Sequence, residues 1–143
     1  MYFNTRIERL ILNNFRNHKY LNLDINKNMV LIYGENGSGK TSVLESISLI
    51  NSSNGFRASN LSEIVNNDLK GPIEMFGVNI LLKESNNLTK VGIGLKKKID
   101  KYQKIISIDE KKNTKNIIKN IPNIYSIIPK MTFIFQGTSE ERR

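Results

Sequence analysis

A glycine-rich loop is the part of the sequence whose residue types and spacing are best suited to chemistry. Residues 34–41 satisfy the pattern G-x-x-x-x-G-K-[ST]. Glycines let such a loop curl until successive main-chain N–H groups point at phosphate oxygens, and the N-terminus of a following helix favours anions. We expect the Lys40 ammonium to reach the β- and γ-phosphates and the Thr41 hydroxyl to bind the bridging Mg²⁺. The alternative is an ordinary glycine-rich turn. The predicted nucleotide-binding residues are Gly34, Glu35, Asn36, Gly37, Ser38, Gly39, Lys40 and Thr41, with Thr41 also the metal ligand.

Such a loop needs a buried strand before it and a helix after it. Residues 29–33 are apolar throughout, which predicts a central strand covered on both faces. Apolar residues recur at helical spacing over 43–50, which predicts a helix that stops near Asn54–Gly55, where glycine can take the left-handed cap conformation. The serines expected on the wetter side of this helix are Ser42, Ser46 and Ser48.

Most of the remaining chain is predicted to form strands. The segments predicted as strands from a two-residue period are 7–12, 21–25, 76–82 and 89–95, and a further strand is expected at roughly 102–108. A turn at 85–87 joins two of them into a predicted hairpin. Asn60 and Glu63 have the spacing of a capping box, which predicts a short helix. A second short helix is expected at 117–121, and 124–128 is strand-like.

Composition and charge exclude several classes of protein to which this chain could belong. The 143 residues suffice for one domain or for part of a larger one. Cysteine is absent, which excludes disulfide scaffolds and thiolate sites, and a lone His18 excludes sites built on two imidazoles, so we expect that residue to be structural or exposed. No apolar run exceeds five residues, so we expect no membrane span and a cytoplasmic protein. The net charge of +9 favours phosphate-rich partners such as nucleic acid, although a lysine-rich coding bias explains it equally well.

Charged residues outside the loop have less specific patterns. The stretch Lys96–Lys119 carries nine lysines against three acids, nine minus three or +6, and fits either a DNA-binding track or a solvated face. Asp109 follows an apolar run as a metal-binding acid would, but lysines come next, so we expect an exposed strand that ends in an acidic turn. Arg16 and Arg57 are expected to approach nucleotide or DNA, or to be surface arginines. The sequence identifies no catalytic residue.

Four landmarks in order resemble a known family. They are Leu10–Asn17, the loop and helix at 34–47, Asn-Gly-Phe-Arg at 54–57, and Pro129 and Gly137 followed by Arg142–Arg143. Together they resemble the RecF recombination mediators, which are related to the heads of SMC and Rad50 proteins and to ABC ATPases. The resemblance implies an α/β P-loop NTPase of ABC/SMC head type, present here as the N-terminal part of a head domain. Residues 1–55 would carry strands, P-loop and helix, and 56–143 a mostly antiparallel, strand-rich lobe.

For a full-length member, the resemblance implies ATP and Mg²⁺ as cofactors, weak ATPase activity and ATP-dependent homodimerisation. It also implies binding of single-stranded or linear double-stranded DNA in replication, repair and the SOS response, with recombination mediator proteins as partners. The family's catalytic acids would lie beyond Arg143, so hydrolysis by the 143-residue chain is not implied. Two other classes stay open: a small self-contained P-loop NTPase or kinase that uses Asp109 as its metal acid, and an inactive truncated remnant with exposed apolar edges.

Overall fold

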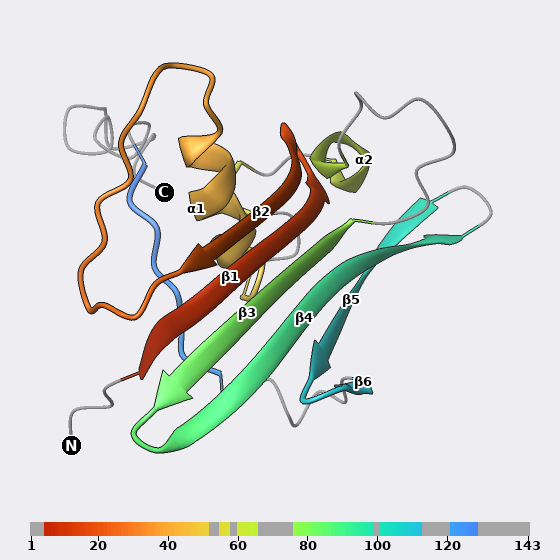
Figure 1. The fold of residues 1–143 in the computed structure, drawn as a ribbon. Coiled ribbons are helices and arrows are strands. Elements are labelled where there is room, and N and C mark those ends of the chain that lie inside the picture. Colours follow the sequence, from red (N-terminus) through yellow and green to blue (C-terminus); the bar gives the residue numbers. More distant parts are fainter. Residues whose placement is uncertain are drawn as a thin grey trace, which may run out of the picture.

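One antiparallel sheet with two helices makes up the regular structure of the described residues (Figure 1). The structure is a computed structural model, and it describes residues 5–51, 55–57, 60–65, 76–98, 101–112 and 121–128. The strands are β1 (Thr5–Phe15), β2 (His18–Asp24), β3 (Gly77–Glu84), β4 (Asn87–Lys98), β5 (Lys101–Ile108) and β6 (Lys111–Lys112). The helices are α1 (Lys40–Ser48) and α2 (Leu61–Ile64).

The sheet has the strand order β2-β1-β3-β4-β5-β6, and every neighbouring pair is antiparallel. The predicted hairpin is confirmed, since β3 and β4 pair from Gly77 opposite Gly94 to Glu84 opposite Asn87. Its turn contains Ser85 at φ 54°, a left-handed conformation typical of tight hairpin turns. The segments predicted as strands at 7–12 and 21–25 form β1 and β2, and the segment at 102–108 forms β5. One face of the sheet packs on the core, and the other is more exposed.

The core lies on the face of the sheet that α1 covers (Figure 1). Its residues from the sheet include Leu10, Leu12, Val78, Ile80, Val91, Ile93, Leu95, Ile106 and Ile108. Val43 and the residues just after α1, Leu49 and Ile50, pack into the same cluster. Phe15 meets Phe76 edge to face with ring centroids 5.5 Å apart, the geometry that aromatic pairs prefer. This packing fixes the N-terminus of α1 beside the end of β1.

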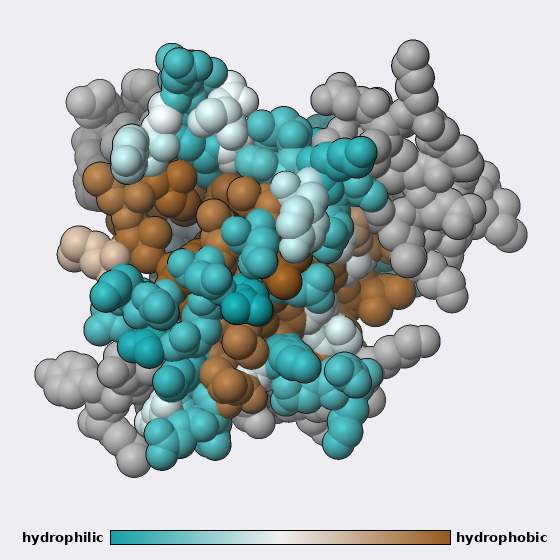
Figure 2. All heavy atoms as spheres, viewed as in Figure 1, coloured by the Kyte–Doolittle hydropathy of each residue, from teal (hydrophilic) through white to brown (hydrophobic). Residues whose placement is uncertain are grey.

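Residues 29–33 do not form the predicted buried strand. They have no strand hydrogen bonds, and Met29, Leu31 and Tyr33 are 90%, 83% and 85% exposed. A central strand needs a neighbour on each edge, and the described residues pair with neither edge of this segment. Apolar residues consequently gather on the surface beside α1, at the left of Figure 2. The sequence pattern was that of a buried strand, but the described structure contains no partner strand for it.

The orientation predicted for the serines of α1 is wrong. Ser42, Ser46 and Ser48 are buried, whereas Leu44 is 51% exposed. The hydroxyls of Ser46 and Ser48 donate to main-chain carbonyls three residues earlier, at 2.6 and 2.7 Å. Because these bonds satisfy the hydroxyls within the helix, burial costs them little. The helix also ends at Ser48, earlier than predicted, and Gly55 takes its left-handed conformation, φ 72°, in the turn that follows.

The remaining sequence predictions have mixed outcomes. The short helix after Asn60 is confirmed as α2, although the Asn60 side chain donates to the Glu63 carboxylate at 3.4 Å instead of capping a main-chain N–H. Residues 124–128 form no strand, so that prediction is wrong. The helix expected at 117–121 lies almost wholly outside the described residues, as do the landmarks from Pro129 onward. No helix in the described ranges has both the length and the apolar character needed to cross a membrane.

Candidate functional site

The loop at 34–41 bends at its three glycines. Gly34, Gly37 and Gly39 have φ of 149°, 85° and 92°, values that side chains with a Cβ rarely adopt. Gly39 is the N-cap of α1, so the first N–H groups of the helix face the loop. A Cβ added at Gly37 would meet open space. A loop of this shape can present main-chain amides to an anion.

Lys40 closes the loop with its own side chain. Its Nζ donates to the carbonyls of Gly34 and Glu35 at 2.7 and 2.6 Å. The Ser38 N–H adds a turn bond to the Glu35 carbonyl at 3.3 Å. Because an ammonium carries three donors, the two loop bonds leave one for a phosphate oxygen. Lys40 therefore stabilises the bend and supplies positive charge at the same point.

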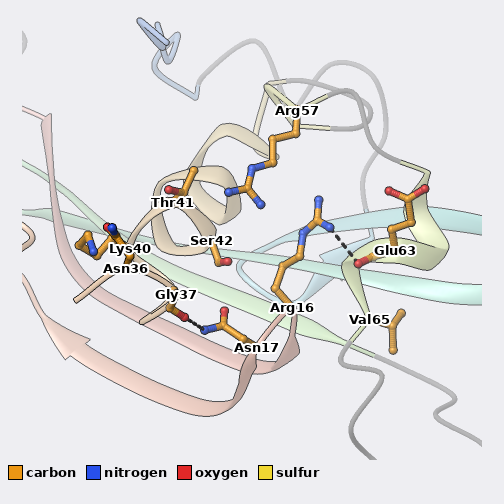
Figure 3. Close-up of a pocket in the computed structure, with 11 residues that line it drawn as sticks. Arg16, Asn17, Asn36, Gly37, Lys40, Thr41, Ser42, Arg57, Glu63 and Val65 are labelled. Atoms are coloured by element: carbon orange, nitrogen blue, oxygen red, sulfur yellow. Dashed lines mark hydrogen bonds between the residues drawn. The ribbon is translucent and has the colours of Figure 1, made fainter. Parts of the chain in front are cut away.

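A cavity of about 520 Å³ opens beside the loop (Figure 3). The predicted residues that line it are Asn36, Gly37, Gly39, Lys40 and Thr41. The other three predicted residues, Gly34, Glu35 and Ser38, are not among the lining residues but take part in the bonds that shape the loop. The structure thus brings the predicted set together around one cavity, with some members at its wall and others in support.

Two arginines from distant parts of the chain reach the same cavity. Arg16 comes from the turn between β1 and β2, and Arg57 comes from the turn after α1. Figure 3 shows their guanidinium groups pointing into one space from opposite sides. With Lys40 they place three cations around the cavity, and Glu63 is the acid among its lining residues. These arginines are therefore part of the cavity wall, and their field attracts anions.

A buried carboxylate lies beneath the arginines. Glu45 of α1 has no exposed surface and accepts hydrogen bonds from Arg16 Nη2 at 2.7 Å and Arg16 Nε at 3.0 Å. Arg57 Nη1 lies 3.6 Å from the same carboxylate. A buried charge persists only when it is paired, so the three side chains form one unit. Sequence reasoning missed Glu45. The available signal was a lone acid in a helix otherwise made of apolar residues, serines and the loop's own Lys and Thr.

The β1–β2 turn also touches the loop. Asn17 Nδ2 donates to the Gly37 carbonyl at 3.3 Å, and His18 Nε2 lies 3.2 Å from the Gly39 carbonyl, to which it donates as an N–H. The turn is a two-residue connection in which Arg16 has φ 53°, as tight hairpins require. The expected structural role of His18 thus takes the form of a contact with the loop. The pattern of the sequence gave no signal for either contact.

Thr41 is the residue for which the sequence predicts a metal-binding role. It lies in the first turn of α1 and lines the cavity. Mg²⁺ in nucleotide sites takes one or two oxygens from the protein and others from the phosphates and water, so a single hydroxyl at this position fits the ion. Asp109 lies elsewhere, since its Oδ1 accepts the Lys90 N–H at 2.9 Å in the turn after β5. The acidic turn expected at Asp109 is confirmed, but the strand before it is not exposed, because Ile106 and Ile108 of β5 belong to the buried core.

The basic stretch is divided by the fold. Its N-terminal part forms the end of β4 and the whole of β5. Lys104 of β5 turns toward the core, where its Nζ donates to the Leu49 carbonyl at 2.7 Å just after α1. Burial lowers the pKa of Lys104. This lysine stabilises the carbonyl end of a helix, whereas residues 113–119 of the stretch lie outside the described residues.

Residues 6–130 match the family described as the RecF/RecN/SMC N-terminal domain. The chain belongs to this family. DNA replication and repair protein RecF of Rickettsia prowazekii is 31% identical to it over 140 residues, covering 98% of this chain and 37% of that protein. RecF of Acetivibrio thermocellus is 34% identical over 137 residues, covering 96% and 36%. The chain therefore spans little more than a third of the length of these curated relatives of the RecF/RecN/SMC family.

A solved structure of the same family has the same fold. The structure of the recombination mediator protein RecF-ATP in the RecFOR pathway superposes with a TM-score of 0.75 at 28% identity, covering 99% of this chain and 38% of that one. The resemblance to RecF proteins and the fold class of an incomplete ABC/SMC-type ATPase head are thus confirmed. Within that fold a helix follows the loop as predicted, although it ends at Ser48 and buries its serines, and 29–33 is not a strand.

Proposed function

We propose that this chain binds ATP and Mg²⁺ at the 34–41 loop and acts in DNA replication and repair as RecF proteins do. The observation that carries the proposal is the convergence of Lys40, Arg16 and Arg57 on one cavity at the N-terminus of α1. Relatives named DNA replication and repair protein RecF and a similar RecF-ATP structure support it. Three cations and a row of helix amides are suited to a polyphosphate more than to any neutral ligand.

In the proposed complex each part of the loop has its own role. The main-chain N–H groups of 34–41 hold phosphate oxygens, and the glycines let the backbone approach them closely. Lys40 balances phosphate charge while it keeps the loop closed. Thr41 offers its hydroxyl to Mg²⁺, which supplies further positive charge against the phosphates. All eight loop residues therefore belong to the proposed nucleotide site, either at its wall or in its support.

The wider role that we propose is a switch on DNA. ATP in the cavity would complete a surface recognised by a second head, so that binding energy favours an ATP-dependent homodimer in the full-length protein. The partners would be single-stranded or linear double-stranded DNA and recombination mediator proteins in the cytoplasm, during replication and the SOS response. Residues 1–55 would contribute the nucleotide unit and 56–143 a strand-rich lobe. The net charge of +9 supports association with DNA.

The test of nucleotide binding is the replacement Lys40→Ala. It removes a cation and both of its loop bonds, so we expect Mg-ATP affinity measured by titration calorimetry to fall by about 10- to 100-fold. Lys90→Ala is the matched control, because Lys90 is 72% exposed and lies outside the cavity lining. Mg-ATP binding that is unchanged in Lys40→Ala would refute the assignment.

Two alternative functions make different predictions. A self-contained P-loop enzyme would hydrolyse ATP over multiple turnovers as this chain alone, but its expected metal acid, Asp109, is bonded in a turn outside the cavity lining. An inactive remnant would bind no nucleotide and would aggregate through exposed apolar residues such as Met29 and Leu31. Calorimetry with Mg-ATP separates the proposed function from the remnant, and a turnover assay separates it from the enzyme.

A further inference from the structure

Glu45 is a charged side chain without exposed surface that lies outside the cavity lining yet contacts two residues within it. Its carboxylate pairs with Arg16 through two hydrogen bonds and with Arg57 at 3.6 Å. Burying a carboxylate in a helix is costly unless its partners hold it well. The arrangement joins α1, which begins at the loop, to the two arginines that face the ligand space.

We propose that Glu45 is a positioning residue for the nucleotide, holding the Arg16 and Arg57 guanidinium groups where a polyphosphate meets them. The inference rests on the proposed function, in which the cavity binds ATP. Arginine side chains lose much rotamer freedom when they bind a ligand, and a partner that orients them beforehand lowers that cost. Glu45 would supply this orientation to both arginines from below.

The two arginines are held to different degrees. Arg16 is 17% exposed, makes the two short bonds to Glu45, and donates from Nη1 to the Glu63 carbonyl at 3.1 Å. Its main-chain N–H also donates to the Ile64 carbonyl at 2.7 Å. Arg57 is 38% exposed and makes the longer contact with Glu45. Glu45 therefore fixes Arg16 in place and guides Arg57, which keeps the freedom to turn toward a ligand.

The turn that carries Arg57 packs directly on Glu45. The Phe56 N–H donates to Ser48 Oγ at 3.1 Å, which ties the turn to the last residue of α1. A Cβ at Gly55 would lie 3.1 Å from Glu45 Cγ, a separation tighter than most real contacts. Gly55 also has φ 72°, where glycine is favoured. The glycine thus permits the close approach that brings Arg57 over the carboxylate.

The charge balance decides the direction of the expected effect. Two arginines against one carboxylate leave the group with a net positive charge at the cavity, so Glu45 does not cancel the attraction for phosphate. Glu45→Gln keeps the size of the side chain but removes the charge that orients both guanidinium groups. If orientation decides affinity, Mg-ATP binds more weakly to this variant. If Glu45 acts chiefly as a competing anion, Mg-ATP binds more tightly.

The experiment measures Mg-ATP affinity by calorimetry in the 143-residue chain, with urea unfolding of each variant as a check on folding. We expect Glu45→Gln to weaken binding about tenfold. Ser48→Ala removes the hydroxyl that accepts the Phe56 N–H and donates to the Glu45 main-chain carbonyl, but it leaves the Glu45 side chain unchanged. Because it loosens the turn that carries Arg57, it should weaken binding about threefold. In an Arg57→Gln background the effect of Glu45→Gln should be smaller, because residues that act as a unit are not additive.

Several results would overturn the inference: unchanged or tighter binding by Glu45→Gln, wild-type affinity in Ser48→Ala, or an equal effect of Glu45→Gln with and without Arg57. If Glu45→Gln fails to fold, Ser48→Ala alone and combined with Arg57→Gln tests whether the turn that carries Arg57 must be held over Glu45. Two other results would instead reject the proposed function: no binding of Mg-ATP by the wild-type chain, or equal binding by Lys40→Ala. Loss of binding in Lys40→Ala with full affinity in Glu45→Gln would reject the Glu45 inference alone.

Discussion

Replacing Gly39 by Ala should distort the 34–41 loop more than the same change at Gly37. Both glycines have φ near 90°, where a residue with a Cβ is destabilised by about 1–2 kcal/mol. At Gly39 the added Cβ would also approach the His18 ring and lie 2.6 Å from Asn17 Nδ2, whereas at Gly37 it meets open space. These two side chains can turn aside only by losing their bonds to the Gly37 and Gly39 carbonyls, and at about 0.5–1.5 kcal/mol a bond this costs about 1–3 kcal/mol more. The total for Gly39→Ala is then about 2–5 kcal/mol, which is at least about thirtyfold in affinity.

The assay is Mg-ATP calorimetry on both glycine variants, with urea unfolding to show how much of the cost is global. Gly37→Ala is the matched control because it carries the same backbone strain without the crowding, and we expect it to weaken binding by about tenfold. The difference between the two variants isolates the contact of the β1–β2 turn with the loop. Equal losses for Gly39→Ala and Gly37→Ala would refute the reasoning that this turn holds the loop.

Two predictions concern residues outside the cavity lining. Burial lowers the pKa of Lys104 below 10.5, so between that lowered pKa and 10.5 the unfolded chain binds a proton that the folded chain lacks, and the free energy of unfolding rises with pH. We expect the free energy of unfolding, measured in urea between pH 7 and 10, to lose this rise in Lys104→Met and to keep it in the control Lys90→Met. Identical pH profiles for the two variants would contradict the prediction. Asp109→Ala should lower the free energy of unfolding by about 0.5–1.5 kcal/mol through the lost bond to the Lys90 N–H, yet leave Mg-ATP affinity unchanged. Weaker Mg-ATP binding by Asp109→Ala in calorimetry would show that Asp109 contributes to the proposed nucleotide site.

Features set by local sequence were predicted well. Alternation over 76–82 and 89–95 gave β3 and β4, because strands that cover a core with one face carry that period in their own residues. The loop at 34–41 was predicted because its bend depends on glycines at fixed positions. The short helix after Asn60 was likewise encoded by neighbouring residues. In each case the physical cause lies within a few positions along the chain.

Features that depend on distant partners were not predicted. Arg16 lies 29 positions before Glu45 in the chain, and nothing in either neighbourhood indicates that the two side chains will meet. The same holds for Asn17, which reaches the loop only because β1 and β2 turn back beside α1. The side of α1 that carries Ser46 was misjudged, since its hydroxyl is satisfied within the helix and so tolerates burial. Polarity alone therefore did not predict which side of the helix is covered.

The segment 29–33 has the apolar composition of a buried strand, yet most of its side chains are exposed among the described residues. Its five apolar residues are the composition of a strand with neighbours on both edges. Leu44 and Ile47 of α1 have the same character, and with Tyr125 and Ile127 they border open apolar spaces near the loop. All these residues are large and apolar, as core residues usually are, although several of them are exposed. The three cations around the cavity are by contrast held by contacts within the described residues, so nucleotide binding at the proposed site can be tested in this chain.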